Sequence, residues 1–121
     1  MKNFLLITED KIIYKDKYFF IIKDAYPVTE GHLLIISNKL RKDYFELSTR
    51  EKEYLQKTIS KAKSLIEEHL TPDGYNIGMN CGEYAGQTIF HFHCHIIPRY
   101  KGDIANPAGG VRGVIPDKMK Y

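Results

Sequence analysis

The sequence predicts one α+β domain, in which a mostly antiparallel β-sheet packs against one long helix. Its 121 residues have the length of one compact domain, and 43% hydrophobic with 27% charged residues is typical of a globular protein with a core. Short β-branched and aromatic runs predict strands, whereas a single long segment repeats its apolar residues with helical spacing. Because no repeat, low-complexity tract or linker divides the chain, residues 1–121 are expected to form one domain.

The first strands are expected near the beginning of the chain. Ile12–Tyr14 and Tyr18–Ile22 are β-branched or aromatic runs, and the three polar residues Lys15–Lys17 between them predict a hairpin. A loop should follow over Asp24–Gly31. The almost continuous apolar run Leu33–Ser37 then predicts a buried strand.

One long helix is expected to begin after Ser48, because Ser48–Glu51 has the S-x-x-E form of a capping box. We expect it to run to about Leu70, before Pro72–Gly74 ends it. Apolar residues at steps of three and four would form a stripe facing the core. They are Leu55, Ile59, Ala62, Ile66 and Leu70.

Two further strands are expected over Tyr75–Asn80 and Ile89–Ile97, joined by a glycine-containing loop from Cys81 to Thr88. The chain should become irregular from about residue 101, since glycine and proline are frequent from Asn106 onward.

Charge and cysteine content indicate an ordinary solvated surface and reduced thiols. The formal charge is +3, but the basic residues are spread along the chain, so a solvated surface is the simpler interpretation and no nucleic-acid partner is expected. Cys81 and Cys94 form no C-x-x-C pair and are expected to be reduced thiols of the cytosol. The apolar run Phe4–Ile7 is too short for a signal peptide or a membrane span, so a cytoplasmic protein without a membrane partner is expected.

The segment Ile89–Ile97 carries three of the five histidines at alternate positions. Side chains on a strand alternate between its faces, and neighbours on one face lie about 6.6 Å apart. The three imidazoles are therefore expected to line one cleft, while the apolar residues between them anchor the strand in the core. The histidines are His91, His93 and His95, and the apolar residues are Phe90, Phe92, Cys94 and Ile96.

Three aligned imidazoles suit phosphoryl chemistry. The ordinary imidazole pKa lies near 6.5, so at neutral pH one ring can act as a nucleophile while a neighbour donates a proton. The alternative is a zinc site, because H-x-H pairs on strands bind zinc. Zinc sites also need supporting carboxylates, and only Glu83 lies nearby in the sequence.

The loop before these histidines has the composition of a phosphate-binding loop. Glycines such as Gly86 let backbone N–H groups approach a phosphate closely. Asn80, Gln87 and Thr88 can donate hydrogen bonds to its oxygens. Taken alone the segment is an ordinary turn, and only the adjacent histidines favour the phosphate interpretation.

The segment His91–Ile97 closely resembles the signature of the histidine triad (HIT) family, in which three histidines alternate with apolar residues. The resemblance extends through Ala85–Thr88 and back to Asp24–Ile36, which is similar to the family's loop leading into a Gly-His strand. Together these segments cover most of the chain. The resemblance implies a HIT-like fold and a homodimer.

The resemblance also implies roles for individual residues. His93 would form a covalent nucleotidyl-histidine intermediate, His95 would contact the phosphate and assist the leaving group, and His91 would orient the nucleophile. His32 would buttress the site, although it could also be a satisfied buried histidine. Further ligand contacts are implied for Asp24 with ribose hydroxyls, Ile22 in an apolar base pocket, and Asn80, Gly86, Gln87 and Thr88 with phosphate. Asp24 could equally be a turn former, and Ile22 a core residue.

The segments Pro98–Arg99 and Lys101–Asp103 are similar to the fragile-histidine-triad branch, which cleaves diadenosine polyphosphates. Asn80 departs from that branch, where glutamine is usual, and is shared with the phosphoramidase branch. The resemblance therefore implies a hydrolase that cleaves adenosine-containing dinucleoside polyphosphates or nucleoside phosphoramidates at the α-phosphate. Arg112 is a candidate for contacting extra phosphates, or it could bind the chain's own C-terminal region.

Two other functions remain open: a nucleotidyl transferase such as a diadenosine tetraphosphate phosphorylase, and a non-catalytic nucleotide-binding regulator. In both enzymatic alternatives the triad would need no metal or other cofactor, although Mg²⁺ could chelate a polyphosphate substrate.

Overall fold

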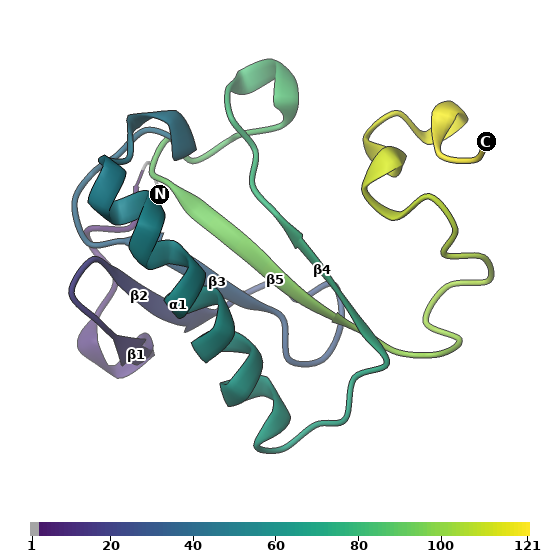
Figure 1. Cartoon of the computed structure of the whole chain (residues 1–121), viewed down its shortest axis with the longest axis horizontal. Helices are drawn as coiled ribbons and strands as arrows, with labels where there is room; N and C mark the ends of the chain where they lie inside the picture. The colour runs from purple at the N-terminus through teal and green to yellow at the C-terminus, as the bar shows by residue number, and fades with distance from the viewer. Residues whose placement is uncertain (1–2) are drawn as a thin grey trace.

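A computed structural model describes residues 3–121 and confirms the predicted α+β fold. One antiparallel sheet of five strands is covered on one face by a long helix (Figure 1). The strands are β1 (Ile12–Lys15), β2 (Phe19–Lys23), β3 (Leu33–Ser37), β4 (Gly74–Gly78) and β5 (His93–Arg99), in the sheet order β1-β2-β3-β5-β4, and the helix is α1 (Thr49–Glu67). Short 3₁₀ turns cover Glu9–Lys11, Tyr44–Glu46, Glu83–Ala85, Gly110–Val114 and Pro116–Lys118.

Two apolar clusters form on the two faces of the sheet. The larger lies between the sheet and α1 and includes Phe19, Ile35, Leu55, Ala62, Ile66 and Phe92. The smaller lies on the opposite face and consists of Phe4, Phe20, Ile22, Leu34 and Ile36. Because both faces are covered, four consecutive residues of β2 and all of β3 are buried, which explains their continuous apolar runs.

The helix begins as predicted. The Ser48 hydroxyl accepts the Glu51 N–H at 3.1 Å, and the Glu51 carboxylate accepts the Ser48 N–H at 2.7 Å, so the capping box is formed. The helix ends at Glu67, three residues before the expected limit. Thr58 is also buried, which the apolar stripe did not predict, because its hydroxyl donates to the Asp16 carboxylate of the β1–β2 turn at 2.7 Å.

The strand that carries the histidine segment, β5, is shorter than predicted. β5 begins at His93 rather than Ile89, because the Phe92 N–H donates to the Arg41 carbonyl and turns the preceding residues away from the sheet. Phe90 is consequently 40% exposed instead of buried. The other predicted core positions of this segment are confirmed, since Phe92, Cys94 and Ile96 are at most 1% exposed.

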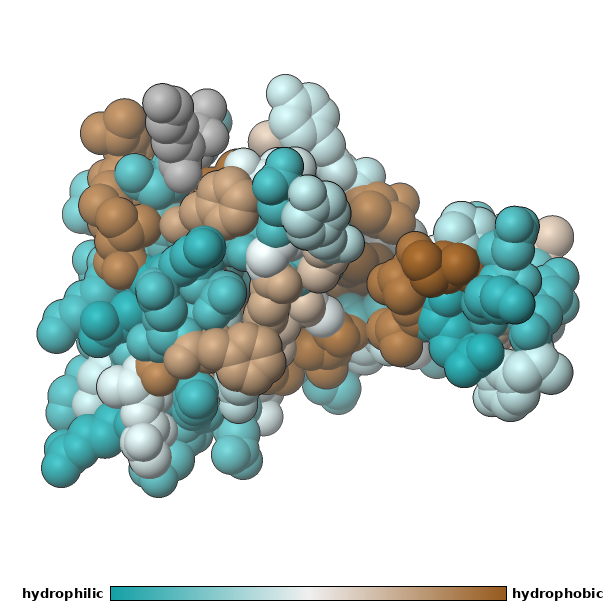
Figure 2. Space-filling view, turned by 90° about the horizontal axis from the view of Figure 1, so that it is seen from above, coloured by the Kyte–Doolittle hydropathy of each residue, from teal (hydrophilic) through white to brown (hydrophobic). Residues whose placement is uncertain are grey.

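The last twenty residues contain only turns and 3₁₀ segments, as expected. They lie beyond β4, and Figure 2 shows them projecting from the body of the molecule with hydrophobic residues on their surface. The Arg112 guanidinium donates to the Lys118 carbonyl at 3.0 Å and lies 4.8 Å from the Tyr121 ring centre. Of its two predicted roles, the structure therefore shows binding to the chain's own C-terminal region.

Among residues 3–121, none of the helices combines the length and the apolar character that crossing a membrane would require.

Candidate active site

His93 and His95 are neighbours on β5, on the sheet face opposite α1. The two residues alternate with Cys94 and Ile96, whose side chains belong to the cluster beneath the helix. Both imidazoles are partly exposed, and their ring centres lie 5.4 Å apart. Because β5 lies between β3 and β4 in the sheet, His95 is paired with both neighbouring strands, while His93 is paired with β3. The structure thus brings together two of the three predicted imidazoles at an accessible face.

A hydrogen bond to the backbone determines the tautomer of His93. Its Nδ1 lies 2.8 Å from the His91 carbonyl oxygen, which can only accept, so Nδ1 carries the hydrogen. In a neutral ring the other nitrogen, Nε2, then holds a free lone pair. This is the protonation state that a histidine nucleophile requires.

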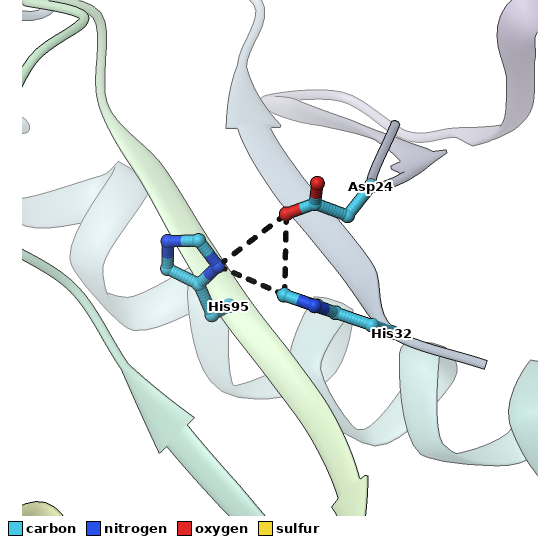
Figure 3. Close-up of side chains that lie close together, drawn as sticks. All are labelled: Asp24, His32 and His95. Atoms are coloured by element: carbon cyan, nitrogen blue, oxygen red, sulfur yellow. Dashed lines mark hydrogen bonds and ion pairs between the residues drawn. The ribbon is translucent and has the colours of Figure 1, made fainter. Parts of the chain in front are cut away.

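A chain of hydrogen bonds assigns the opposite role to His95. The Val28 N–H donates to His32 Nδ1 at 3.0 Å, so the hydrogen of a neutral His32 ring lies on Nε2. His32 Nε2 lies 2.9 Å from His95 Nδ1 and donates to it (Figure 3). The hydrogen of His95 must therefore lie on its own Nε2, which points away from this pair. His95 therefore presents a donor on the ring next to that of His93.

Asp24 completes this cluster. One carboxylate oxygen lies 3.3 Å from His32 Nε2 and 3.8 Å from His95 Nδ1, and the other accepts the Tyr26 N–H at 2.8 Å (Figure 3). Asp24 is thus a turn former and also the negative charge nearest to the two histidines. Its predicted contact with ribose stays a prediction.

Burial favours the neutral forms of His95 and His32. Removal from water, together with the nearby His93 and His32, lowers the pKa of His95 to about 4, although Asp24 opposes the shift. Burial likewise lowers the pKa of His32 against the opposing charge of Asp24. A bound phosphate would raise the His95 pKa again, because a negative charge nearby favours the imidazolium.

The position of His91 corrects the prediction that three rings line one cleft. His91 is fully buried and precedes β5, because the strand begins only at His93. Its Nε2 donates to the Ser37 carbonyl at 2.8 Å, and its Nδ1 accepts the Phe4 N–H at 3.0 Å. The pKa of His91 is lowered mainly by burial. Its role in orienting the nucleophile stays a prediction, and the carbonyl that binds His93 Nδ1 provides a route for it.

Gln87 does not have the predicted geometry of a phosphate donor. Its side chain is buried, and its amide nitrogen donates to the carbonyls of Lys42 at 2.6 Å and Ile89 at 3.1 Å. Its amide oxygen accepts the Gly82 N–H at 2.8 Å. With both amide hydrogens engaged, this side chain folds the loop instead of presenting donors to a ligand.

The other predicted ligand residues have mixed positions. Asn80, Gly86 and Thr88 are exposed, and the Asn80 amide lies beside Gly86, whose φ of +96° favours glycine. Their contacts with phosphate stay predictions. Ile22 is 7% exposed within the smaller apolar cluster, so it is a core residue, and its place in a base pocket is not tested by this packing.

The cluster of Asp24, His32 and His95 also has the spacing of a metal site, with ligand atoms within 4.8 Å of one another. A neutral histidine binds a metal through a lone pair. The lone pair of His32 is on Nδ1, where it accepts the Val28 N–H, so Nε2 has none to offer. The donor pattern therefore fits proton transfer better than metal binding.

Two residues that hydrogen-bond to the histidines could not be predicted from the sequence. Phe4 and Val28 act through backbone N–H groups, and any residue except proline offers one. The contact between Asp24 and the histidines was also unexpected, although the resemblance had identified the residue.

Comparisons with known proteins find relatives of this chain. The family description "HIT domain" matches residues 7–102. The chain is 33% identical to a bis(5'-adenosyl)-triphosphatase of Dictyostelium discoideum, over 84% of this chain and 68% of that protein. It is 29% identical to an AP-4-A phosphorylase of Mycobacterium tuberculosis, over 78% of this chain and 49% of that protein.

A solved structure is also similar. It is a hypothetical histidine triad nucleotide-binding protein from Sulfolobus tokodaii, with a TM-score of 0.71 and 37% identity over 76% of this chain and 62% of that one. The chain thus spans less than two thirds of the Sulfolobus protein and about half of the phosphorylase.

The lowered histidine pKa values predict that the protein loses stability in mild acid. The unfolded chain binds protons on these histidines near pH 6.5, whereas folded His95 binds one only near pH 4. The free energy of unfolding should therefore fall as the pH drops between these values, by up to about 1.4 kcal/mol per pH unit for each such proton. Urea unfolding at several pH values measures the slope.

The variant His95→Asn should reduce this slope, and His69→Asn, at an exposed position, serves as the matched control. Equal slopes for the wild type and His95→Asn would contradict the assignment.

Proposed function

Because the chain belongs to the HIT family, whose members include nucleotide hydrolases and transferases, we propose that it cleaves nucleotides at the α-phosphate through a covalent intermediate on His93. The observation that carries the proposal is the pair of opposite tautomers on β5. His93 offers a lone pair on Nε2, and the neighbouring His95 offers an N–H on Nε2. A nucleophile and a donor side by side are what displacement at phosphorus requires.

In the first step, the Nε2 lone pair of His93 forms a bond to the α-phosphorus, and the bond from phosphorus to the leaving group breaks. The leaving group departs with the electron pair, and His95 Nε2–H donates a hydrogen bond to it or to a phosphate oxygen. The ring of His93 becomes positively charged. Its Nδ1–H remains bonded to the His91 carbonyl, whose partial negative charge stabilises that state.

In the second step, an acceptor oxygen forms a bond to the phosphorus of the nucleotidyl-histidine from the side that the leaving group vacated. The bond from phosphorus to His93 Nε2 breaks, its electron pair returns to Nε2, and an attacking water releases a proton to the solvent. Water gives a hydrolase, and inorganic phosphate gives a phosphorylase. The hydrolase is favoured by 33% identity to the triphosphatase over most of this chain, and the phosphorylase by the more distant AP-4-A relative. Each step inverts the configuration at phosphorus, so the complete reaction retains it.

The proposed substrate is an adenosine-containing dinucleoside polyphosphate or phosphoramidate. The printed name of the Dictyostelium relative supports the adenosine polyphosphate. A nucleotide also fits the electrostatics, because its negative phosphate would offset the unfavourable burial of an imidazolium at His95. We propose no resident metal, since the nitrogens of the site are arranged for nucleophilic attack and donation. Mg²⁺ would act on polyphosphate substrates alone.

A turnover screen tests this proposal. The purified protein is mixed with diadenosine triphosphate, diadenosine tetraphosphate or adenosine phosphoramidate, each with and without inorganic phosphate. We expect cleavage that persists on the phosphoramidate after exhaustive chelation of metals. Zinc-dependent recovery of a chelated, inactive protein would establish the metal alternative. Nucleotide binding without turnover on any substrate would favour the regulator.

Replacement of the nucleophile should separate chemistry from binding. His93→Ala is expected to lower kcat by at least about a thousandfold while nucleotide affinity changes little, because the covalent bond is lost and the other contacts remain. Free imidazole should partly restore the activity of His93→Gly. Non-acidic quenching of the wild type with labelled substrate, followed by peptide mapping, locates the label. Label on another residue, or inversion at a chiral α-phosphorus, would contradict the mechanism.

We also propose that the protein is a homodimer. β4 stands at one edge of the sheet, with β5 as its partner among the described strands, and Ile77 on it is 46% exposed. An edge strand with an exposed apolar residue can pair with a second copy. Light scattering at assay and at high micromolar concentrations should give twice the chain mass of 14.1 kDa. A monomer mass at both concentrations would refute the dimer.

A further inference from the structure

The segment Asn3–Ile7 is held on the histidine-bearing face by one buried residue. Phe4 is 6% exposed and belongs to the smaller apolar cluster, whereas Leu5 and Leu6 beside it are 53% and 82% exposed. Ile7 packs against the same cluster but is only half-buried, so Phe4 is the one buried side chain that positions the segment. Phe4 is therefore the anchor.

The backbone around Phe4 is folded into a turn that directs its N–H. The Leu5 N–H donates to the Asn3 side-chain oxygen at 2.8 Å, and the Ile7 N–H donates to the Phe4 carbonyl at 3.2 Å. The Phe4 N–H in turn donates to Nδ1 of His91, 87 residues along the chain, at 3.0 Å. This bond is buried, so water does not compete for it.

The Phe4 ring also contacts two histidine rings. Its centre lies 5.6 Å from that of His91 and 5.1 Å from that of His93, with interplanar angles of 64° and 69°. These are edge-to-face contacts, which favour one relative orientation of the rings. Phe4 thus contacts His93, the proposed nucleophile, through its ring. It contacts His91 twice, through the ring and through the backbone N–H.

We propose that Phe4 is a positioning residue for His91 and His93. The inference rests on the proposed function for its kinetic consequences. The Phe4 N–H leaves the hydrogen of His91 on Nε2, where it binds the Ser37 carbonyl at 2.8 Å. His91 is thereby held at both nitrogens, and its own carbonyl is fixed where it accepts Nδ1–H of His93.

The hydrogen bond from the Phe4 N–H to His91 Nδ1 also prevents a positive charge on His91, beside the proposed nucleophile His93. A protonated His91 would direct an Nδ1–H against the Phe4 N–H, so this ring is held neutral. The titratable group whose charge acts on His91 is His93, and the other groups facing it are the uncharged Ser37 carbonyl and Phe4. His93 gains a positive charge when it bonds to phosphorus, and a second cation beside it would oppose that step.

Two substitutions at position 4 distinguish the effect of the backbone N–H from that of the ring. Phe4→Ala removes the ring and keeps the N–H, whereas Phe4→Pro removes both. We expect Phe4→Pro to have a kcat about tenfold below that of Phe4→Ala at equal KM, since Phe4→Pro also loses the positioning hydrogen bond. The matched controls are Leu6→Ala and Leu6→Pro, because the Leu6 N–H has no hydrogen-bond partner among residues 3–121. These two should agree within about twofold.

Nitrogen-15 NMR of the imidazoles provides a readout that does not depend on activity. Wild type and Phe4→Ala should show His91 protonated on Nε2 alone, and Phe4→Pro should show a mixture of tautomers. In the wild type, scalar coupling across the N–H···N bond should connect the Phe4 backbone nitrogen with His91 Nδ1, which tests the contact even if Phe4→Pro does not fold.

Absence of that coupling, or equal tautomers and kcat in folded Phe4→Ala and Phe4→Pro, would overturn the inference. A wild-type protein that shows the coupling but no turnover would retain the contact and refute the proposed function instead.

Discussion

A neutral imidazole carries one hydrogen on two nitrogens, so the group that meets one nitrogen decides what the other can do. Backbone N–H groups meet Nδ1 of His32 and of His91, and a backbone carbonyl meets Nδ1 of His93. His95 is the exception, because its Nδ1 meets His32. The difference between the proposed nucleophile and the proposed donor on β5 is therefore set by main-chain groups from separate segments, and it depends on the whole fold.

Burial maintains the tautomers that these hydrogen bonds select. A solvated histidine could exchange protons with water and take up either tautomer, but the pKa of His95, His32 and His91 is lowered because water is largely excluded from them. The sheet supplies that exclusion, since an apolar cluster lies on each of its faces. Asp24 partly offsets the burial, which leaves the cluster ready to gain positive charge when an anionic ligand approaches.

The parts of this architecture that were predictable from the sequence have local patterns. The capping box at Ser48 and the alternation of Phe92, Cys94 and Ile96 are each contained in a few consecutive residues, and the structure confirms them. The hydrogen bonds of Phe4 to His91 and of Gln87 to Lys42 join residues 87 and 45 positions apart. No periodicity encodes such contacts, so the burial of His91 and the inward direction of Gln87 followed only from the fold. Individual ligand contacts came from the family resemblance and remain proposals.

Distance alone would assign the triangle of Asp24, His32 and His95 to a metal ion as readily as to proton transfer. The nitrogen that carries the lone pair of His32 distinguishes metal binding from proton transfer. Binding a cation through His32 Nε2 would move its hydrogen to Nδ1, against the Val28 N–H that now donates there. The Val28 N–H would then lose its acceptor, a loss that proton transfer toward a phosphate avoids. A single main-chain N–H outside the histidine segment thus favours acid–base chemistry over metal binding at this site.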